Sequence, residues 1–263
     1  MKDLWNRLWN GFKIAFSMYS KIPMPKSEWT KENMEYALIF FPWIGLVTGF
    51  FSFIWVYSWE WMENARICLS EPFKAIVLLL IPVVITGGIH LDGLLDTADA
   101  RSSWQDRERR LEILKDSHAG AFAIITCVVY FFFYYGICTM VNVENIWLIV
   151  MGFVLSRSFS ALAIVTFPKA KGTGLAAMFA DNAQKRTVKF VEIIYIILIG
   201  IAMIVTGGIS GVITFVPACL MFAYYYRMSS RVFGGITGDL AGYFLQMCEM
   251  VIALAAVLSV LVF

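Results

Sequence analysis

Residues 86–100 read Thr-Gly-Gly-Ile-His-Leu-Asp-Gly-Leu-Leu-Asp-Thr-Ala-Asp-Ala, and an apolar run long enough to cross a membrane leads directly into them. The stretch carries three carboxylates, Asp92, Asp96 and Asp99. If it is helical, the spacings of four and three residues place all three on one face, about one turn apart. Carboxylates so close repel one another unless a cation lies between them. The stretch therefore predicts a metal site, and its hard oxygen ligands favour Mg²⁺.

The composition of the whole chain is that of an integral membrane protein. Of its 263 residues, 60% are hydrophobic and 15% are charged, whereas about 25% of an ordinary soluble domain is charged. The net charge of +2 provides no strongly basic surface for a nucleic acid. The five cysteines are scattered singly and form no CxxC pair, so they indicate packing rather than a disulfide frame or a zinc site.

Seven apolar runs approach the roughly 20 residues that a membrane-spanning helix needs. They lie at 37–57, 73–90, 119–141, 145–167, 190–206, 209–226 and 243–263. The predicted fold is therefore an all-α, polytopic membrane helix bundle with about seven transmembrane helices. No linker, internal repeat or low-complexity segment divides the chain, so we expect residues 1–263 to form a single domain.

Glycine and proline predict irregularities in this bundle. The run at 190–206 is short and Gly207-Gly208 follows it, so the fifth and sixth spans are expected as either a hairpin or a broken pair. Pro42 and Pro82 fall within predicted spans, where proline removes a backbone hydrogen bond. We therefore expect a kink at each proline.

The amino-terminal segment is predicted to be an amphipathic helix. Its large apolar residues recur at helical spacing along one face: Leu4, Trp5, Leu8, Trp9, Phe12, Phe16 and Tyr19. This pattern is typical of a helix that lies in the membrane interface, and it equally fits a helix packed against the bundle. Basic residues interrupt the segment, so no cleavable signal peptide is expected.

The basic residues predict the orientation of the bundle. Eighteen of the 21 Lys and Arg fall on one side of the seven-span arrangement, in residues 1–36, 91–118, 168–189 and 227–239. Loops rich in Lys and Arg face the cytoplasm in membrane proteins. The amino terminus, the charged loops and the acidic stretch are therefore expected on the cytoplasmic side, and the carboxyl terminus on the opposite side.

A second acidic motif lies at the same predicted edge, where Gly-Gly-Ile-Thr-Gly precedes Asp239. A glycine-rich turn can hold a phosphate through its backbone N–H groups. Gly234, Gly235 and Thr237 are therefore candidate phosphate-binding residues, although the same pattern fits an ordinary turn. Lys115 is a further candidate, with lipid headgroups as its alternative partners.

Histidine and arginine add to this chemistry. His90 and His118 each adjoin an acidic motif, so each is a candidate ligand, phosphate donor or proton shuttle. Arg157 falls within a predicted span, where it needs an anionic partner unless it extends to the interface. Carboxylates, Mg²⁺ and arginine at a membrane edge are the groups that phosphoryl transfer uses.

Several segments together resemble the cobalamin synthase family, the adenosylcobinamide-GDP ribazoletransferases. The most specific are Gly-Gly-Ile-His-Leu-Asp-Gly-Leu-Leu-Asp-Thr-Ala-Asp at 87–99, Arg-Arg-Leu-Glu-Ile-Leu-Lys-Asp-Ser at 109–117, and Gly-Gly-Ile-Thr-Gly-Asp at 234–239. Residues 19–25, 41–45, 156–157 and 172–179 extend the resemblance over most of the chain.

The resemblance implies a multi-pass enzyme of the prokaryotic cytoplasmic (inner) membrane that completes adenosylcobalamin. Its implied substrates are adenosylcobinamide-GDP and α-ribazole or α-ribazole 5′-phosphate, and its products are adenosylcobalamin or its 5′-phosphate, together with GMP. Mg²⁺ is the implied cofactor. The expected partners are these substrates, the lipid bilayer and, as an open alternative, further copies of the chain.

The resemblance also implies roles for the candidate residues. The ribazole 5′-oxygen is taken to attack the cobinamide-linked phosphate and expel GMP. Mg²⁺ is expected on Asp92, Asp96, Asp99 and Asp239, with Asp92 and Asp96 catalytic. The expected base is Asp116 or His90. Arg157 and Lys115 are expected to contact phosphate, with Gly234, Gly235 and Thr237. Gln246 occupies a position where the family carries Glu, so it is not expected to be an essential ligand, whereas Glu249 keeps the second Glu.

Two other functions fit parts of the sequence. An intramembrane phosphotransferase that uses CDP-alcohols also clusters Asp residues on helices, but it expects Ala-Arg where Leu95-Asp96 stands. A cation or corrinoid transporter expects acids near the bilayer midplane and discontinuous spans. Here the acidic motifs lie at the predicted ends of spans.

Overall fold

The computed structural model describes residues 2–67, 69–116 and 118–262, which form a bundle of α-helices. Within these residues, six helices are long and apolar enough to span a membrane, and a bent pair brings the number to seven. The six are α3 (Phe41–Asn64), α7 (Ala121–Cys138), α8 (Ile146–Thr166), α10 (Lys185–Gly207), α11 (Ile209–Met228) and α12 (Gly238–Val262). The bent pair is α4 (Glu71–Thr86) with α5 (Ile89–Ser102). The predicted all-α, multi-pass fold is confirmed.

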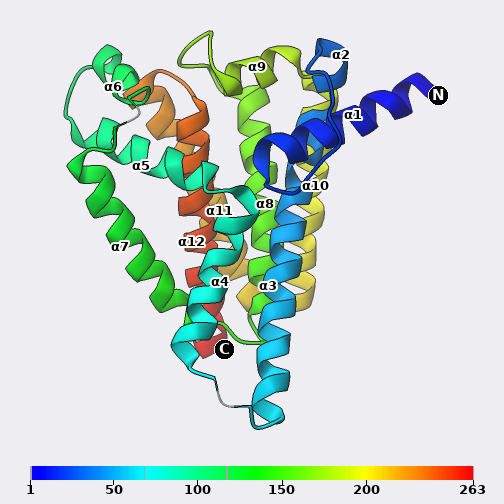
Figure 1. Cartoon of the computed structure of the whole chain (residues 1–263), viewed down its shortest axis with the longest axis vertical. Coiled ribbons are helices and arrows are strands. Elements are labelled where there is room, and N and C mark those ends of the chain that lie inside the picture. Colours follow the sequence, from blue (N-terminus) through cyan, green and yellow to red (C-terminus); the bar gives the residue numbers. More distant parts are fainter. Residues whose placement is uncertain (1, 68, 117, 263) are drawn as a thin grey trace.

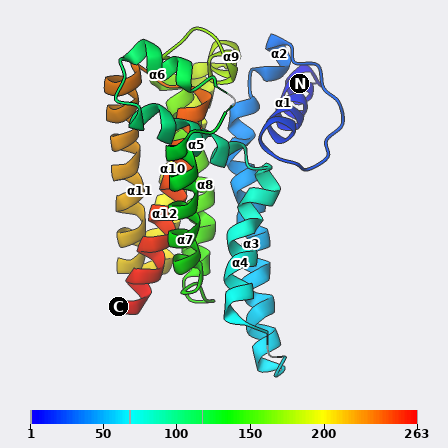
Figure 2. The ribbon, with the colours of Figure 1, turned by 60° about the vertical axis from the view of Figure 1, so that its left-hand side comes forward.

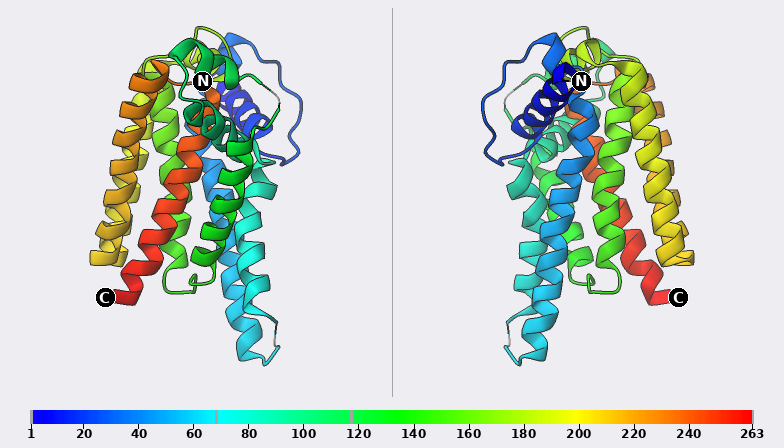
Figure 3. Two further views of the ribbon diagram at one scale, coloured as in Figure 1. Left: turned by 90° about the vertical axis from the view of Figure 1, so that its left-hand side faces the viewer. Right: turned by 90° about the vertical axis from the view of Figure 1, so that its right-hand side faces the viewer.

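The charge-bearing elements gather at one end of the bundle, at the top of Figure 1. This charged end carries α1 (Lys2–Tyr19), α2 (Lys31–Met34), α5, α6 (Arg107–Ile113) and α9 (Leu175–Asn182). The turns from α3 to α4 and from α7 to α8 lie at the opposite end, together with the carboxyl terminus. Figures 2 and 3 show that the hairpin of α3 and α4 extends beyond the other helices there.

Helix α8 forms the centre of the bundle and packs against α3, α10 and α12. Small residues allow this close approach, as is usual between membrane helices. A Cβ atom added at Gly45 of α3 would overlap the carbonyl of Phe153, and one at Gly152 would overlap the side chain of Ile252 on α12. Helix α8 therefore packs closely against α3 and α12 at these two glycines.

The two prolines behave differently. Pro82 lies inside α4, as predicted, and Thr86 donates a hydrogen bond to its carbonyl at 2.7 Å. Pro42 lies in the first turn of α3, directly after the short 3₁₀ helix η1 (Ala37–Phe40). An N–H in the first turn has no intrahelical partner to lose, so the kink predicted inside a span at Pro42 is wrong.

Helices α10 and α11 form a hairpin rather than a broken span. The chain reverses at Gly207-Gly208, where Gly208 has a φ of +54°, a left-handed conformation that favours glycine. Gly211 of α11 lies directly against the backbone of Met203 on α10. Of the two alternatives for residues 190–226, the hairpin is correct.

Helix α1 packs against the bundle, which is one of the two arrangements predicted for it, and its place in the membrane interface stays a prediction. In its second half, Ile14, Ala15 and Phe16 are buried, and the helix packs on η1 and α3. In its first half, Trp5 and Trp9 remain exposed on a helix that lies across the charged end. The helix is thus fixed to the bundle at one end and presents aromatic side chains to its surroundings at the other.

A sharp bend places the acidic stretch. Helices α4 and α5 meet at an angle of 94° at Gly87-Gly88, whose φ angles are +67° and +79°. Both angles are left-handed, which glycine adopts without the strain that other residues incur. Helix α5 consequently turns away from the direction of the spans and lies across the charged end (Figure 1).

Candidate active site

Two glycines bring the two acidic motifs together. Helix α5 packs on α12, and a Cβ added at Gly93 would lie 2.5 Å from the carbonyl oxygen of Asp239. On the other side of the contact, a Cβ at Gly242 would lie 2.9 Å from the carbonyl oxygen of His90. Because no side chain separates the two backbones, the acids of α5 lie beside Asp239 at the start of α12.

The acids of the two helices influence one another. The pKa of Asp96 is raised to about 6, first by burial and then by the negative charges of Asp92, Asp239 and Asp99. These four residues are called the acid cluster below. Across the described ranges, no three His, Cys, Asp or Glu side chains are already arranged to hold a metal ion. Repelling carboxylates still match the hard oxygen ligands that a divalent cation such as Mg²⁺ requires.

Asp99 has a contact that sequence reasoning missed. Its carboxylate accepts hydrogen bonds from the backbone N–H groups of Gly120, at 2.5 Å, and Ala123, at 2.8 Å. These groups begin α7, where backbone N–H groups have no intrahelical partner. Asp99 therefore caps α7 from a distant helix. Its role as a metal ligand stays a prediction.

His90 is buried beside two aromatic rings. Its side chain lies against Tyr19 and Phe41, with ring centroids 6.3 and 5.8 Å away. Burial, and secondly the positive charge of Arg157, lower the pKa of His90 to about 3. The imidazole is therefore neutral at physiological pH and a weak proton acceptor. Its Nε2 has no hydrogen-bond partner within the part of the chain that the structure describes.

An apolar cavity of ≈ 250 Å³ lies beside His90. Its walls include Met18, Tyr19, Phe41, Ile164, Leu175 and Leu245. Its polar contributors include Asp92, Asp239 and Ser160, whose hydroxyl is buried without a described partner. This apolar cavity thus opens onto the acid cluster.

A second cavity, of ≈ 170 Å³, adjoins the first. It contains Lys115 and Lys171 and is called the lysine cavity. The two cavities share Leu175, Ala176, Gly238 and Asp239. Burial and the neighbouring charge of Lys115 lower the pKa of Lys171, as expected for cations held close together. The predicted phosphate-binding residue Lys115 therefore lies beside Asp239, with a second lysine that the sequence did not single out.

The glycine-rich turn before Asp239 has structural partners. Gly235 donates its N–H to the carbonyl of Ser229 at 3.0 Å, and the guanidinium of Arg107 lies directly over Gly234. Thr237 Oγ1 accepts the N–H of Leu240 at 3.2 Å, which caps α12. These contacts position Asp239, and the phosphate-binding role of Gly234, Gly235 and Thr237 stays a prediction.

Asp116 and Arg157 lie apart from this junction. Asp116 is exposed and lines neither of the two cavities. Its carboxylate accepts the backbone N–H of His118 and contacts the His118 ring, and both contacts lower its pKa. Arg157 is fully buried, and the anionic partner expected for it is Glu249. The phosphate contact of Arg157 and the catalytic role of Asp116 stay predictions.

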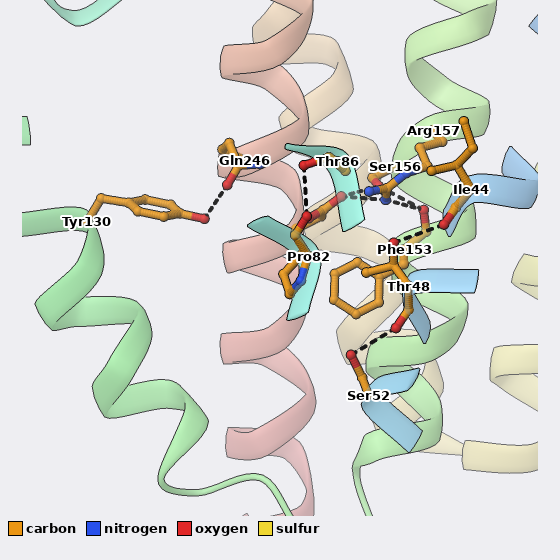
Figure 4. A network of polar contacts seen from close by, with 11 residues as sticks. Ile44, Thr48, Ser52, Pro82, Thr86, Tyr130, Phe153, Ser156, Arg157 and Gln246 are labelled. Atoms are coloured by element: carbon orange, nitrogen blue, oxygen red, sulfur yellow. Dashed lines mark hydrogen bonds and ion pairs between the residues drawn. The ribbon is translucent and has the colours of Figure 1, made fainter. Parts of the chain in front are cut away.

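Figure 4 shows a network of polar contacts that includes Arg157 and Gln246. The guanidinium of Arg157 donates to the carbonyl of Phe153 at 2.8 Å. Gln246, expected not to be an essential ligand, instead accepts a hydrogen bond from the hydroxyl of Tyr130 at 2.6 Å. That contact links α12 to α7.

Comparison with known proteins identifies the family of the chain. The family described as cobalamin-5-phosphate synthase matches residues 11–257. The chain belongs to this family.

Curated relatives in the cobalamin-5-phosphate synthase family cover nearly the whole chain. The adenosylcobinamide-GDP ribazoletransferase of Lachnoclostridium phytofermentans is 44% identical over 254 residues, which are 97% of this chain and 94% of that protein. The protein of the same name from Clostridium botulinum strain Alaska E43 is 29% identical over 249 residues, and the match covers 93% of this chain and 95% of that protein. The protein from Fusobacterium nucleatum is 27% identical over 263 residues, and the match covers 92% of this chain and 94% of that protein. No solved structure matches the chain.

Sequence motifs of the cobalamin-5-phosphate synthase family identified the acids but not the cavities. Lys171 and Ser160 lie far along the chain from the acidic stretch, and neither belongs to a recognisable motif. One signal could have found Lys171, because it is one of only two lysines in the short segment between α8 and α9. Nothing in the local sequence indicates that Ser160 faces a cavity.

Proposed function

We propose that the protein is an adenosylcobinamide-GDP ribazoletransferase of the prokaryotic inner membrane. It joins a ribazole-type acceptor to the corrinoid and releases GMP. Membership of the cobalamin-5-phosphate synthase family over residues 11–257 carries this proposal. The names of the relatives and the junction of acids and lysines at Asp239 support it.

The reaction replaces the anhydride bond of the diphosphate with an ester bond to the acceptor. An acceptor hydroxyl oxygen forms a bond to the cobinamide-linked phosphorus, the bridging bond of the diphosphate breaks, and GMP leaves with that bridging oxygen. The family name denotes a product with a 5-phosphate. When the acceptor already carries this phosphate, its 5′-oxygen is occupied. We therefore assign the attack to a ring hydroxyl of the ribose, in place of the 5′-oxygen expected from the sequence.

The residues present fit a metal-assisted transfer. Asp92, Asp96 and Asp239, with Asp99 beside them, offer the carboxylate ligands that Mg²⁺ prefers. Bound Mg²⁺ would neutralise charge on the diphosphate. Lys115 and Lys171 bind phosphate oxygens in the lysine cavity.

The attacking hydroxyl must lose its proton. Asp92 is exposed, lines the apolar cavity and belongs to the acid cluster, so it is the proposed proton acceptor. The low pKa of His90 favours a hydrogen-bonding role over that of a base. Asp116 is exposed and already paired with His118, so it is the weaker candidate.

The charged end is proposed to face the cytoplasm. Eighteen of the 21 Lys and Arg were assigned to this side from the sequence. A reporter fused after residue 262 tests the orientation, since a periplasmic phosphatase placed there should be active and a cytoplasmic fluorescent protein dark. The reverse result would place the site outside the cytoplasm.

Turnover by the purified protein tests the activity. The protein in liposomes receives adenosylcobinamide-GDP, α-ribazole and Mg²⁺, and the release of GMP is measured. We expect release that depends on all three components and is lost in Asp96→Asn. Folded protein that releases no GMP from verified substrates would reject the proposal. Full activity of Asp96→Asn, with its Mg²⁺ dependence intact, would reject the assigned site.

A further inference from the structure

We propose that the apolar cavity binds the heteroaromatic base of the ribazole-type acceptor, with His90 and Ser160 as its hydrogen-bond partners. This inference rests on the proposed function and adds to it the position of one substrate. The cavity lies between α1, α3, α5, α8, α9 and α12, and it opens onto Asp92 and Asp239.

The volume of the cavity limits which part of the substrates can enter it. Pockets for drug-sized ligands measure about 300–1,000 Å³. At ≈ 250 Å³, the apolar cavity takes a group smaller than these ligands. A dimethylbenzimidazole fits this description, whereas a corrin macrocycle with its peripheral amides is far too large. The corrinoid must therefore lie outside the cavity.

The chemistry of the cavity walls distinguishes the two aromatic groups that remain, the guanine of the donor and the dimethylbenzimidazole of the acceptor. Guanine presents donors and acceptors along most of its edge, and each needs a partner when it leaves water. The cavity is lined mainly by apolar side chains, including Phe41, Ile164 and Leu245. A dimethylbenzimidazole carries one free ring nitrogen and two methyl groups, which match such walls. Tyr19 and Phe41 provide aromatic faces beside it.

Two residues of the cavity lining carry a buried polar atom without a described hydrogen-bond partner. His90 is 4% exposed and Ser160 is 1% exposed, yet His90 Nε2 and Ser160 Oγ have no hydrogen-bond partner among the described residues. Buried polar groups are nearly always hydrogen-bonded in folded proteins. Both residues line the apolar cavity. The ring nitrogen and a ribose hydroxyl of the acceptor would satisfy these two atoms.

The arrangement also orders the reacting groups. With the base in the apolar cavity, the ribose extends toward Asp92 and Asp239. The lysine cavity begins on the other side of Asp239 and is left for the diphosphate. The acceptor hydroxyl and the phosphorus thus approach the acid cluster from opposite cavities.

Direct binding to the unmodified protein provides the first test. Equilibrium dialysis of the purified protein in detergent, without donor substrate, measures the Kd of α-ribazole and of the analogue lacking both ring methyls. Each buried methyl contributes about 0.8 kcal/mol, so we expect the analogue to bind roughly 15-fold more weakly. Equal affinities would overturn the proposal, because they would mean that the base stays in water.

Substitutions in the cavity provide the second test. Ala241 is buried and lines the apolar cavity, so Ala241→Leu should fill it and weaken α-ribazole binding at least tenfold. Ala202→Leu is the matched control, because Ala202 is half-buried on α10 and lines neither cavity. Ser160→Ala should weaken binding about fivefold through the loss of one hydrogen bond. Unchanged affinity in folded Ala241→Leu would overturn the proposal. If that variant does not fold, the comparison of α-ribazole with the analogue lacking both ring methyls decides whether the proposal holds.

The two proposals fail in different ways. If α-ribazole binds as described but the protein releases no GMP, the cavity assignment stands and the proposed function fails. If turnover is normal but Ala241→Leu leaves the KM for α-ribazole unchanged, the function stands and the cavity assignment fails. The KM for adenosylcobinamide-GDP should stay within about twofold in Ser160→Ala, because the donor lies outside the apolar cavity.

Discussion

Arg157 and Glu249 form a buried ion pair between α8 and α12, with Nη1 2.6 Å from Oε1. The side chains are 0% and 1% exposed. The hydroxyl of Ser156 lies 3.2 Å from the same carboxylate oxygen, as a hydrogen-bond donor. Since the charge of Arg157 also lowers the pKa of His90, the pair links the interior of the bundle to the candidate site.

Removing one member of this pair should be more harmful than removing both. Glu249→Gln leaves the guanidinium of Arg157 buried without a countercharge, which costs about 3–5 kcal/mol. The double variant Arg157→Met, Glu249→Leu removes both charges and should recover most of that loss. Thermal unfolding in detergent measures the unmodified protein and both variants. A double variant less stable than Glu249→Gln would contradict this account.

Asp96→Asn should stabilise the metal-free protein at neutral pH while it abolishes turnover. The pKa of Asp96 is about 6 in the folded protein, against an ordinary value of 3.8. Its charge therefore opposes folding above pH 6, and this penalty disappears as the pH falls toward 4. The variant's gain in unfolding temperature should be larger at pH 7.5 than at pH 5.

Mg²⁺ provides the control for this variant. A ligand that binds only the folded state raises the unfolding temperature. Added Mg²⁺ should therefore stabilise the unmodified protein and have little effect on Asp96→Asn. An equal rise in the unfolding temperature of both proteins would show that Asp96 does not bind the metal.

Gly93→Ala should inactivate the protein. A Cβ at this position would lie 2.5 Å from the carbonyl oxygen of Asp239, so α5 and α12 must separate and the acid cluster opens. Gly136→Ala is the matched control, because no atom lies within 4 Å of a Cβ there. Alanine in the interior of a helix should stabilise that variant by about 0.5–1 kcal/mol. GMP release and unfolding temperature distinguish the two, and an active Gly93→Ala protein would refute the close contact.

Substitutions of Asp99 test whether its carboxylate acts as a helix cap or as a metal ligand. Asp99→Ala removes the acceptor for the N–H groups of Gly120 and Ala123, which should cost about 1 kcal/mol of stability. If capping is its main role, Asp99→Asn should keep most of the stability and most of the Mg²⁺ affinity. A loss of Mg²⁺ affinity as large as that of Asp96→Asn would make Asp99 a ligand.

Lys171→Gln should weaken the binding of the diphosphate substrate. Lys171 and Lys115 share the lysine cavity, so the variant should raise the KM for adenosylcobinamide-GDP about tenfold and leave the KM for α-ribazole unchanged. Lys169→Gln is the control, since Lys169 pairs with Asp181 outside that cavity. A similar KM for adenosylcobinamide-GDP in both variants would show that Lys171 does not bind this donor.

The spans could be predicted from the sequence because each consists of consecutive apolar residues. The acids were predicted to act together because Asp92, Asp96 and Asp99 repeat at helical spacing. The bend at Gly87-Gly88 was not predicted, since glycine permits a left-handed φ without requiring one. Without that bend, the stretch continues the span instead of crossing the charged end.

The contacts that complete the site join residues far apart in the chain. Asp99 caps α7 through Gly120, and Arg157 finds its partner in Glu249. Such partners depend on how the helices pack, and helical spacing within one segment carries no information about them. The two cavities were missed for the same reason, because each has walls from several elements.

The contact of α5 with α12 also determines when the site forms during biosynthesis. Asp92 and Asp96 leave the ribosome long before Asp239, and four spanning helices separate the two motifs. Chains are synthesised from the amino terminus at about 5–20 residues per second. The growing chain therefore inserts most of its helices while its acids still lack their partner, and it gains a complete site only once α12 has docked on α5.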